Sequence, residues 1–199
     1  MPCYKSIEVY FLAAGKSERM GYSKPLLPFK AGTVLSTMVN SFREAGLQKI
    51  RVIGRADDPD LARETNVLNA RYIFNLEPES GMASSILEAL DDCRSSWMCV
   101  TPADIPLLTS NTISACLEAL EGAEIAQPEC LGKGKHPIFL KSNLALEMRP
   151  FLRQGGTLRD FLATQSVRKI SRPNPTEFMD MDTHDDYIRL LQEVGLGPN

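Results

Sequence analysis

The sequence predicts an α/β fold built on a mostly parallel sheet, and two observations lead to that prediction. Apolar segments with strand character alternate along the chain with segments of helical periodicity, which is typical of parallel strands joined by right-handed crossovers. The chain has 199 residues, of which 43% are hydrophobic and 24% are charged. A chain of this length buries about 70% of its unfolded surface on folding. We therefore expect a single domain over residues 1–199.

The expected elements follow one another at the spacing of such a fold. Thr33 is a typical helix cap before an apolar stripe with helical spacing, and Gly46 is a typical helix stop. The strands expected from apolar runs are 7–12, 50–53, 71–75, 97–101, 123–127, 138–140 and 167–170. The helices expected from periodicity and caps are 34–45, 57–65, 82–93, 109–120, 143–150, a short one from 158, and 185–194.

Composition and charge exclude several functional classes. The net charge of −3 gives no general basic face, so we do not expect a nucleic-acid partner. The five cysteines are odd in number and widely spaced, which favours thiols in a reducing cytoplasm over a disulfide framework or a Cys-x-x-Cys metal site. No signal peptide opens the sequence and no apolar run is long enough to cross a bilayer, so we expect a cytoplasmic protein without a membrane partner.

The loop after the first expected strand has the composition of an anion site. Ala13, Ala14 and Gly15 let backbone N–H groups approach a ligand, and Gly15 can adopt backbone angles that other residues avoid. Three cations follow within nine positions: Lys16, Arg19 and Lys24. Arg and Lys are the usual phosphate-binding side chains, but no P-loop or dinucleotide motif is present. The residue types alone leave an ordinary solvated loop equally open.

Three later segments place polar groups near expected strand or helix ends. Asn75 ends a strand, and Gly81 and Ser85 lie at the start of the next helix, where free N–H groups are available to a ligand. Asp104 follows the central strand, at the edge where open parallel sheets bind ligands. Asp180 and Asp182 would share one face of an extended segment, where two carboxylates repel unless a cation is near. From the residues alone, helix caps and turn residues remain open for all three segments.

The order of residues in Leu12–Phe29 narrows these alternatives. Leu-Ala-Ala-Gly-x-Ser-x-Arg-Met-Gly-x-x-Lys-Pro-Leu-Leu closely resembles the nucleotide-binding signature of the MobA-like NTP-transferase family, in particular its molybdenum cofactor cytidylyltransferases (MocA type). The Asn followed by Gly-Met-x-x-Ser-Ile, the Asp-x-Pro-x-Leu element and the Asp-x-Asp-Thr ending are also similar to that family, from about Val9 to Leu191. The resemblance implies a Rossmann-like three-layer sandwich of the nucleotide-diphospho-sugar transferase kind.

The resemblance also implies a role for each matching residue. Lys24, Arg19 and Asp104 would be catalytic, and Asp104 and Asp182 would hold Mg²⁺, with Mn²⁺ as an alternative. The nucleotide-binding residues implied are Leu12, Ala13, Ala14, Gly15, Lys16, Ser17, Arg19, Lys24, Asn75, Gly81 and Ser85.

Two further elements depart from the family pattern, and they are the candidates for binding the acceptor. The family's Gly-x-Pro or Gly-His-Pro element here has Lys135 before His136, and a turn histidine bonded to the backbone remains open. The family's Gly-Asp-x-Gly-x-Arg element corresponds to Gly155–Asp160, which contains Arg159 but is one residue shorter and lacks the Asp. A plain turn that caps a helix also remains open there.

The implied reaction moves CMP, or less favourably GMP, from an NTP to a phosphorylated acceptor, with molybdopterin favoured and pyrophosphate released. A phosphate oxygen is already ionised at neutral pH, so positioning and charge neutralisation suffice, and the sequence shows no Ser-His-Asp, Cys-His or zinc constellation. CTP is favoured because Ala13-Ala14-Gly15 resembles the cytidylyl-transferring members. A molybdoenzyme that receives the product is a further implied partner. The alternatives are a sugar- or polyol-phosphate nucleotidyltransferase and a non-catalytic nucleotide-binding delivery protein.

Overall fold

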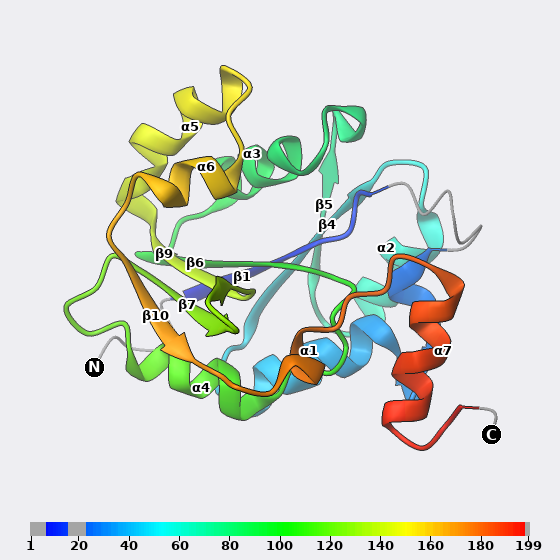
Figure 1. Ribbon diagram of the computed structural model, residues 1–199. Helices are drawn as coiled ribbons and strands as arrows, with labels where there is room; N and C mark the ends of the chain where they lie inside the picture. Colours follow the sequence, from blue (N-terminus) through cyan, green and yellow to red (C-terminus); the bar gives the residue numbers. More distant parts are fainter. Residues whose placement is uncertain (1–6, 16–22, 198–199) are drawn as a thin grey trace.

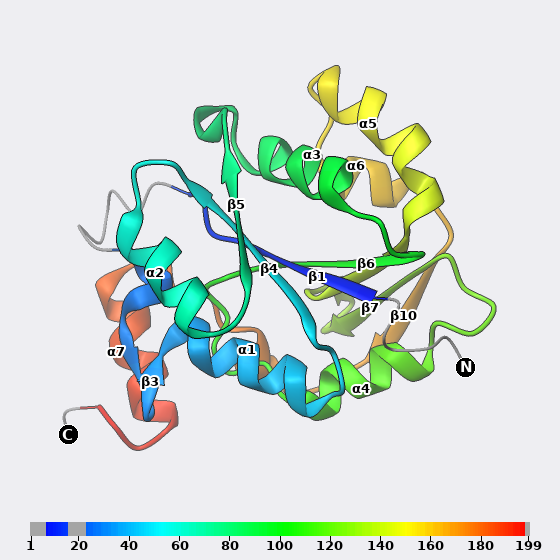
Figure 2. The same ribbon diagram turned by 180° about the vertical axis from the view of Figure 1, so that it is seen from behind.

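The computed structural model describes residues 7–15 and 23–197, and its centre is a twisted sheet with helices on both faces (Figure 1). Among the described residues, eight strands form this sheet in the order β10-β7-β9-β6-β1-β4-β5, with β8 paired to β7. Helices α3, α5 and α6 cover one face, and α1 and α4 cover the other, as the views from the front and from behind both show (Figure 1, Figure 2). The expected three-layer α/β architecture is confirmed.

Most neighbouring strands are parallel, as the alternation of strands and helices predicted. β1 pairs in parallel with β4 and β6, β4 pairs in parallel with β5, and β10 pairs in parallel with β7. β9 is antiparallel to both of its neighbours, β6 and β7. The strands are β1 (Ile7–Leu12), β4 (Lys49–Arg55), β5 (Arg71–Asn75), β6 (Trp97–Pro102), β7 (Ile125–Cys130), β8 (Lys133–Gly134), β9 (Ile138–Lys141) and β10 (Val167–Ser171), with a small hairpin of β2 (Pro28–Phe29) and β3 (Gly32–Thr33).

Five of the α-helices in the described residues begin after a residue whose side chain caps them. Thr33, Thr157 and Thr183 each form a capping box with the residue three positions later. The α-helices are α1 (Val34–Glu44), α2 (Pro59–Val67), α3 (Met82–Asp92), α4 (Ser110–Glu118), α5 (Ala145–Arg153), α6 (Leu158–Ala163) and α7 (His184–Glu193). Short 3₁₀ helices occur at η2 (Lys24–Leu26), η3 (Pro78–Ser80), η4 (Ser142–Leu144) and η5 (Pro175–Phe178). In the described residues, no helix has the length and apolar character that a membrane span requires.

Several expected boundaries differ by one or two residues, and two ends differ by three. The helix expected to end at Pro150 continues to Arg153, because the Pro150 carbonyl still accepts the Gln154 N–H and the buried Leu152 packs against the core. The strand expected over 123–127 is Ile125–Cys130 instead, because its register is set by parallel pairing with β10 and antiparallel pairing with β9.

The core lies on both faces of β1, whose residues are all buried. Ile7, Val9 and Phe11 point into one apolar cluster, which also contains the buried faces of α1 and α4. Tyr10 and Leu12 point into the second cluster, with buried residues of α3, α5 and α6. The alternation along β1 therefore places one of its faces in each half of the core.

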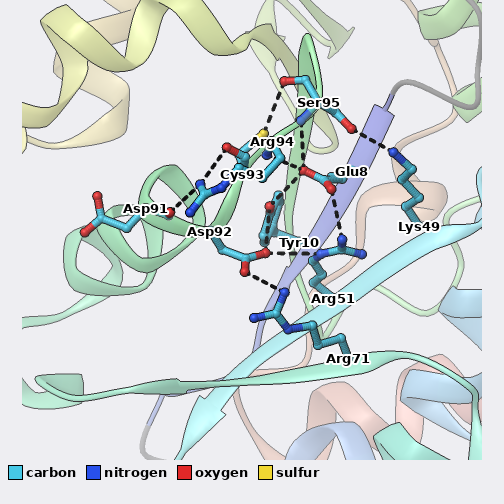
Figure 3. A network of polar contacts seen from close by, with 10 residues as sticks. All are labelled: Glu8, Tyr10, Lys49, Arg51, Arg71, Asp91, Asp92, Cys93, Arg94 and Ser95. Carbon is cyan, nitrogen blue, oxygen red and sulfur yellow. Dashed lines mark hydrogen bonds and ion pairs between the residues drawn. The ribbon is translucent and has the colours of Figure 1, made fainter.

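A buried carboxylate interrupts the apolar sequence of β1. Glu8 is only 4% exposed, yet it lies on a central strand. Its carboxylate accepts the backbone N–H of Arg94 at 2.9 Å and that of Ser95 at 3.2 Å, and it pairs with Arg51 at 2.9 Å (Figure 3). Burial raises the pKa of Glu8, but the hydrogen bonds at Arg94, Cys93 and Ser95 and the Arg51 charge together lower it below its usual value.

The same network continues through Asp92, the last residue of α3. Asp92 pairs with Arg51 at 3.1 Å and with Arg71 at 2.9 Å, and the Tyr10 hydroxyl donates to it at 3.1 Å (Figure 3). Glu8 is the second residue of β1, and Arg71 is the first residue of β5. The network therefore ties the end of α3 to the amino-terminal edge of the sheet.

Candidate functional site

The loops that follow β1 and β6 leave the sheet side by side at its carboxyl edge. In the strand register, Leu12 lies opposite Ile53 of β4 and Pro102 of β6. The Ala13 N–H donates to the Ile53 carbonyl at 2.8 Å, and the Ala103 N–H donates to the Leu12 carbonyl at 3.2 Å. This hydrogen bonding brings the expected anion loop and the segment containing Asp104 to neighbouring strand ends, where open α/β sheets bind ligands.

Three of the predicted site residues meet at one point of this edge. The Lys24 ammonium nitrogen lies 2.8 Å from Oδ1 of Asp182 and 3.5 Å from Oδ2 of Asp104. The two carboxylates are 158 and 80 positions away from Lys24 in the sequence. The predicted convergence of Lys24, Asp104 and Asp182 is therefore present in the structure.

Local packing determines where each of these side chains points. Asp104 lies between the buried residues Ala103 and Ile105, so its carboxylate is the polar part of a largely buried loop. Met181 is fully buried and lies between Asp180 and Asp182, both of which are exposed. The alternation expected for this segment is therefore observed, with both carboxylates on the side opposite the core.

The site has an excess of negative charge among the described residues. Burial raises the pKa of Asp104 above its usual value, and Asp180 and Asp182 add to the effect, while Lys24 opposes it. Asp180 thus acts electrostatically on Asp104, although sequence reasoning did not select it as a site residue. The sequence pattern placed Asp180 on one face with Asp182, but the family resemblance implied a metal role for Asp182 and not for Asp180.

The residues present fit a hard divalent cation. Asp104 and Asp182 supply the carboxylate oxygens that Mg²⁺ and Mn²⁺ accept, and the Lys24 ammonium already stands between them as a cation. In the described part of the chain, no cluster of three or more His, Cys, Asp or Glu side chains forms a metal site.

The anion loop is only partly described. Lys16, Ser17 and Arg19 lie outside the described residues. Leu12 and Ala14 are buried, and a Cβ built on Gly15 would meet no atom within 4 Å. Gly15 does not adopt a positive φ, so the special backbone angle expected there is not used. Gly15 has no side chain, and this leaves open space beside the strand ends.

The side chain of Asn75 forms its hydrogen bonds inside the protein. It is 2% exposed, its amide donates to Ser84 Oγ at 2.8 Å and to Ser85 Oγ at 2.9 Å, and its carbonyl accepts the Glu77 N–H at 2.9 Å. Ser84 Oγ in turn donates to the Gly81 carbonyl at 2.7 Å. Asn75 and Ser85 therefore shape the loop between β5 and α3. Ser84 completes this connection between the two elements.

Gly81 occupies a conformation that only glycine adopts readily. Its φ of 79° and ψ of −163° lie outside the regions open to residues with a Cβ. α3 begins directly after it, and no side chain caps that helix. Gly81 is the N-cap residue of α3, and Ser84 and Ser85 are buried in the first turns, so the capped helix with a small packing face that the sequence left open is observed.

The two acceptor-side candidates have different environments. His136 precedes β9 beside the carboxyl end of β6, and its Nδ1 lies 3.3 Å from the Val100 carbonyl. Burial lowers the pKa of His136 to about 4, so the ring is neutral at pH 7. Arg159 is exposed in the first turn of α6. The backbone-bonded histidine that the sequence left open is thus observed.

The chain is similar to known proteins over most of its length. Residues 9–170 match the family described as the MobA-like NTP transferase domain. The molybdenum cofactor cytidylyltransferase of Escherichia coli (strain K12) is 26% identical over 185 residues, which cover 92% of this chain and 94% of that protein. A molybdenum cofactor guanylyltransferase of Xanthomonas euvesicatoria pv. vesicatoria (strain 85-10) is 28% identical over 192 residues, or 92% and 93% of the two chains.

The fold is shared with solved structures as well. A nucleotidyl transferase from Methanothermobacter superposes with a TM-score of 0.81 at 17% identity, and the match covers 94% of this chain and 97% of that one. This likeness concerns the arrangement of the sheet and helices.

Proposed function

The chain belongs to the MobA-like NTP transferase domain family, and from that premise we propose that it transfers CMP from CTP to a phosphorylated acceptor of the molybdopterin type and releases pyrophosphate. The observation that carries the proposal is the meeting of Lys24 with Asp104 and Asp182 at the carboxyl edge of the sheet. A nucleotidyltransferase needs a cation for phosphate and carboxylates for a metal at one place, and these three residues supply both.

The reaction follows from the charges of its partners. An oxygen of the acceptor phosphate attacks the α-phosphorus of CTP, the bond from that phosphorus to the bridging oxygen breaks, and pyrophosphate leaves. The attacking oxygen is already ionised, so no general base is required. In this proposal Lys24 moves beside the α-phosphate and neutralises the charge that develops there, while Lys16 and Arg19 hold the β- and γ-phosphates.

Asp104 and Asp182 would hold Mg²⁺, with Mn²⁺ as an alternative. Bound there, the ion would supply Lewis-acid polarisation of the triphosphate oxygens. The neutral His136 is the acceptor-side residue that the geometry supports better, because it lies at the same sheet edge, whereas Arg159 is exposed on α6.

CTP is proposed over GTP on the basis of Ala13-Ala14-Gly15, which resembles the cytidylyl-transferring members of the family. One of the two relatives is named a cytidylyltransferase and the other a guanylyltransferase, so their names support nucleotidyl transfer but do not distinguish cytosine from guanine. Molybdopterin is proposed as the acceptor because both of these relatives carry the molybdenum cofactor in their names. The departure of the Gly155–Asp160 segment from the family pattern keeps a sugar- or polyol-phosphate acceptor as the second candidate.

The test is pyrophosphate release with CTP, GTP, ATP and UTP, each with and without purified molybdenum cofactor. We expect release only with cofactor and fastest with CTP. Release with a sugar or polyol phosphate in place of the cofactor would move the assignment to the second candidate. Nucleotide binding with no release from any acceptor would support a non-catalytic delivery protein instead.

Variants test the assigned residues directly. Asp104→Ala and Lys24→Ala should each lower turnover by about 10²- to 10³-fold, the usual cost of losing one preorganised charge contact. Lys30→Ala is the matched control, because Lys30 is exposed and its ammonium lies over the Phe29 ring at 5.9 Å. Turnover of either test variant within tenfold of the wild type, with the fold retained by circular dichroism, would contradict the assignment.

A further inference from the structure

The two carboxylates of the candidate metal site already share one cation, the Lys24 ammonium. The Lys24 side chain is 16% exposed, whereas that of Asp182 is 60% exposed. Lys24 thus reaches the acidic pair from inside the protein, while Asp182 faces solvent. The adjoining Pro25 is buried and starts η2 together with Lys24, which anchors the backbone from which the side chain extends.

A divalent ion cannot join both carboxylates while the ammonium stays between them. The cation would lie within a few ångströms of Nζ, where like charges repel strongly at the reduced dielectric of a half-buried site. Asp182 would also have to give up its 2.8 Å contact with Nζ in order to become a metal ligand. Metal binding to the nucleotide-free protein is therefore in competition with Lys24.

A triphosphate changes this balance, because it supplies a second anionic partner for the lysine. The Lys side chain is a long stem with a compact charge, so its ammonium can move several ångströms without backbone change. When the ammonium turns to a phosphate oxygen, both carboxylates lose their contact with Lys24 and the site becomes more negative. The Asp180 carboxylate, exposed two residues before Asp182, adds to that charge.

We propose that Lys24 acts as a built-in counter-ion that excludes the divalent cation from the nucleotide-free protein, so that cation and nucleotide are acquired together. This inference rests on the proposed function, since it assigns the carboxylates to the metal and the lysine to the phosphate. It gives Lys24 a role before the reaction, in addition to the role proposed for it during phosphoryl transfer.

The test is Mn²⁺ binding without nucleotide, followed through the loss of the free-ion signal in electron paramagnetic resonance. The variant is Lys24→Met, which keeps the length of the side chain and removes its charge. We expect it to bind Mn²⁺ at least about tenfold more tightly than the wild type, a modest fraction of the electrostatic repulsion at this separation. The matched control is Lys30→Met, which changes the net charge equally and should leave the Mn²⁺ affinity of the wild type unchanged.

Two further measurements separate this effect from others. Lys24→Met combined with Asp182→Asn should lose the gained affinity, because one of the two metal-binding carboxylates is then removed. Adding a non-hydrolysable α,β-methylene CTP to the wild type should raise its Mn²⁺ affinity beyond that of the analogue alone in solution. Thermal unfolding of each variant shows whether the fold is retained.

The outcomes are distinct for the two proposals. Equal Mn²⁺ affinity of Lys24→Met and wild type without nucleotide would overturn the counter-ion role, even if the variant had lost turnover. Equal tightening in Lys30→Met would overturn it too, because the effect would then come from net charge. Tighter Mn²⁺ binding by Lys24→Met alone supports the counter-ion role, whether or not the pyrophosphate assay identifies CTP as the substrate.

Discussion

Replacing Glu8 by Gln tests whether the buried network at the amino-terminal edge of the sheet stabilises the fold. The substitution keeps the size and shape of the side chain, so it opens no cavity. It removes the negative charge that accepts two backbone N–H groups, at 2.9 Å and 3.2 Å, and that pairs with Arg51 at 2.9 Å. The amide has one oxygen and one NH₂ group, so it can satisfy the backbone donors or the guanidinium, but not both.

The magnitude follows from these contacts. Hydrogen bonds to a charged group contribute about 1.5–3 kcal/mol each, and breaking a buried ion pair costs about 3–5 kcal/mol. Arg51 retains its contact with Asp92 at 3.1 Å, which places the expected loss near the lower end of that range. We therefore expect Glu8→Gln to lower the free energy of unfolding by about 3 kcal/mol.

Urea unfolding, followed by the fluorescence of Trp97, measures this loss. Trp97 is the one tryptophan of the chain, and it is buried in β6, so its emission reports on the core around the sheet. With an m-value of about 1–3 kcal/mol/M, the midpoint should fall by roughly 1–3 M. Glu147→Gln, at an exposed position of α5, should shift the stability by no more than about 0.5 kcal/mol. A loss below about 1 kcal/mol for Glu8→Gln would refute the reasoning, because it is smaller than one charged hydrogen bond.

Three other predictions concern Glu8, Gly54 and Asn75. Folding lowers the pKa of Glu8, so its ionised carboxylate stabilises the protein above the unfolded pKa, and this stabilisation is lost as the pH falls through the folded pKa. The urea midpoints of Glu8→Gln below pH 5 should therefore depend less on pH than those of the wild type. In Gly54→Ala the new Cβ would lie 2.0 Å from the Tyr72 hydroxyl, so the free energy of unfolding in urea should fall by about 1–3 kcal/mol. An unchanged free energy of unfolding would mean that the Tyr72 ring moves aside without cost. Asn75→Ala removes the hydrogen-bond partner of Ser84, Ser85 and the Glu77 N–H, so it should lower the free energy of unfolding by about 1–3 kcal/mol. The same variant should raise the KM for the nucleotide more than it lowers kcat, and an unchanged KM would separate the loop from the nucleotide site.

Local sequence patterns predicted much of the fold. The alternation in β1 placed its apolar residues on both faces, and Thr33 and Thr183 marked the starts of α1 and α7. These features depend on side-chain periodicity and on hydrogen bonds between residues three or four positions apart. The ordered series of strands and helices, and with it the parallel sheet, follows from such short-range signals.

The candidate site was only partly readable in this way. Residue types and the family resemblance identified Lys24, Asp104 and Asp182, and the structure brings them together. The resemblance also pointed to Asn75 as a ligand contact, whereas the structure shows its amide bonded to Ser84 and Ser85 inside the protein. A polar residue at a strand end looks the same in the sequence whether it binds a ligand or forms hydrogen bonds inside the protein. The sequence pattern does not show the direction of the side-chain hydrogen bonds.

The sequence by itself determined which segments are strands and helices, and which residue types could bind phosphate and metal. Only the tertiary structure decided that β9 lies antiparallel between β6 and β7, that Glu8 is neutralised by Arg51, and that Lys24 stands between Asp104 and Asp182. The physical reason is the range of the interactions. Periodicity and capping act within a few residues, whereas strand order and charge pairing depend on packing between segments up to 158 positions apart.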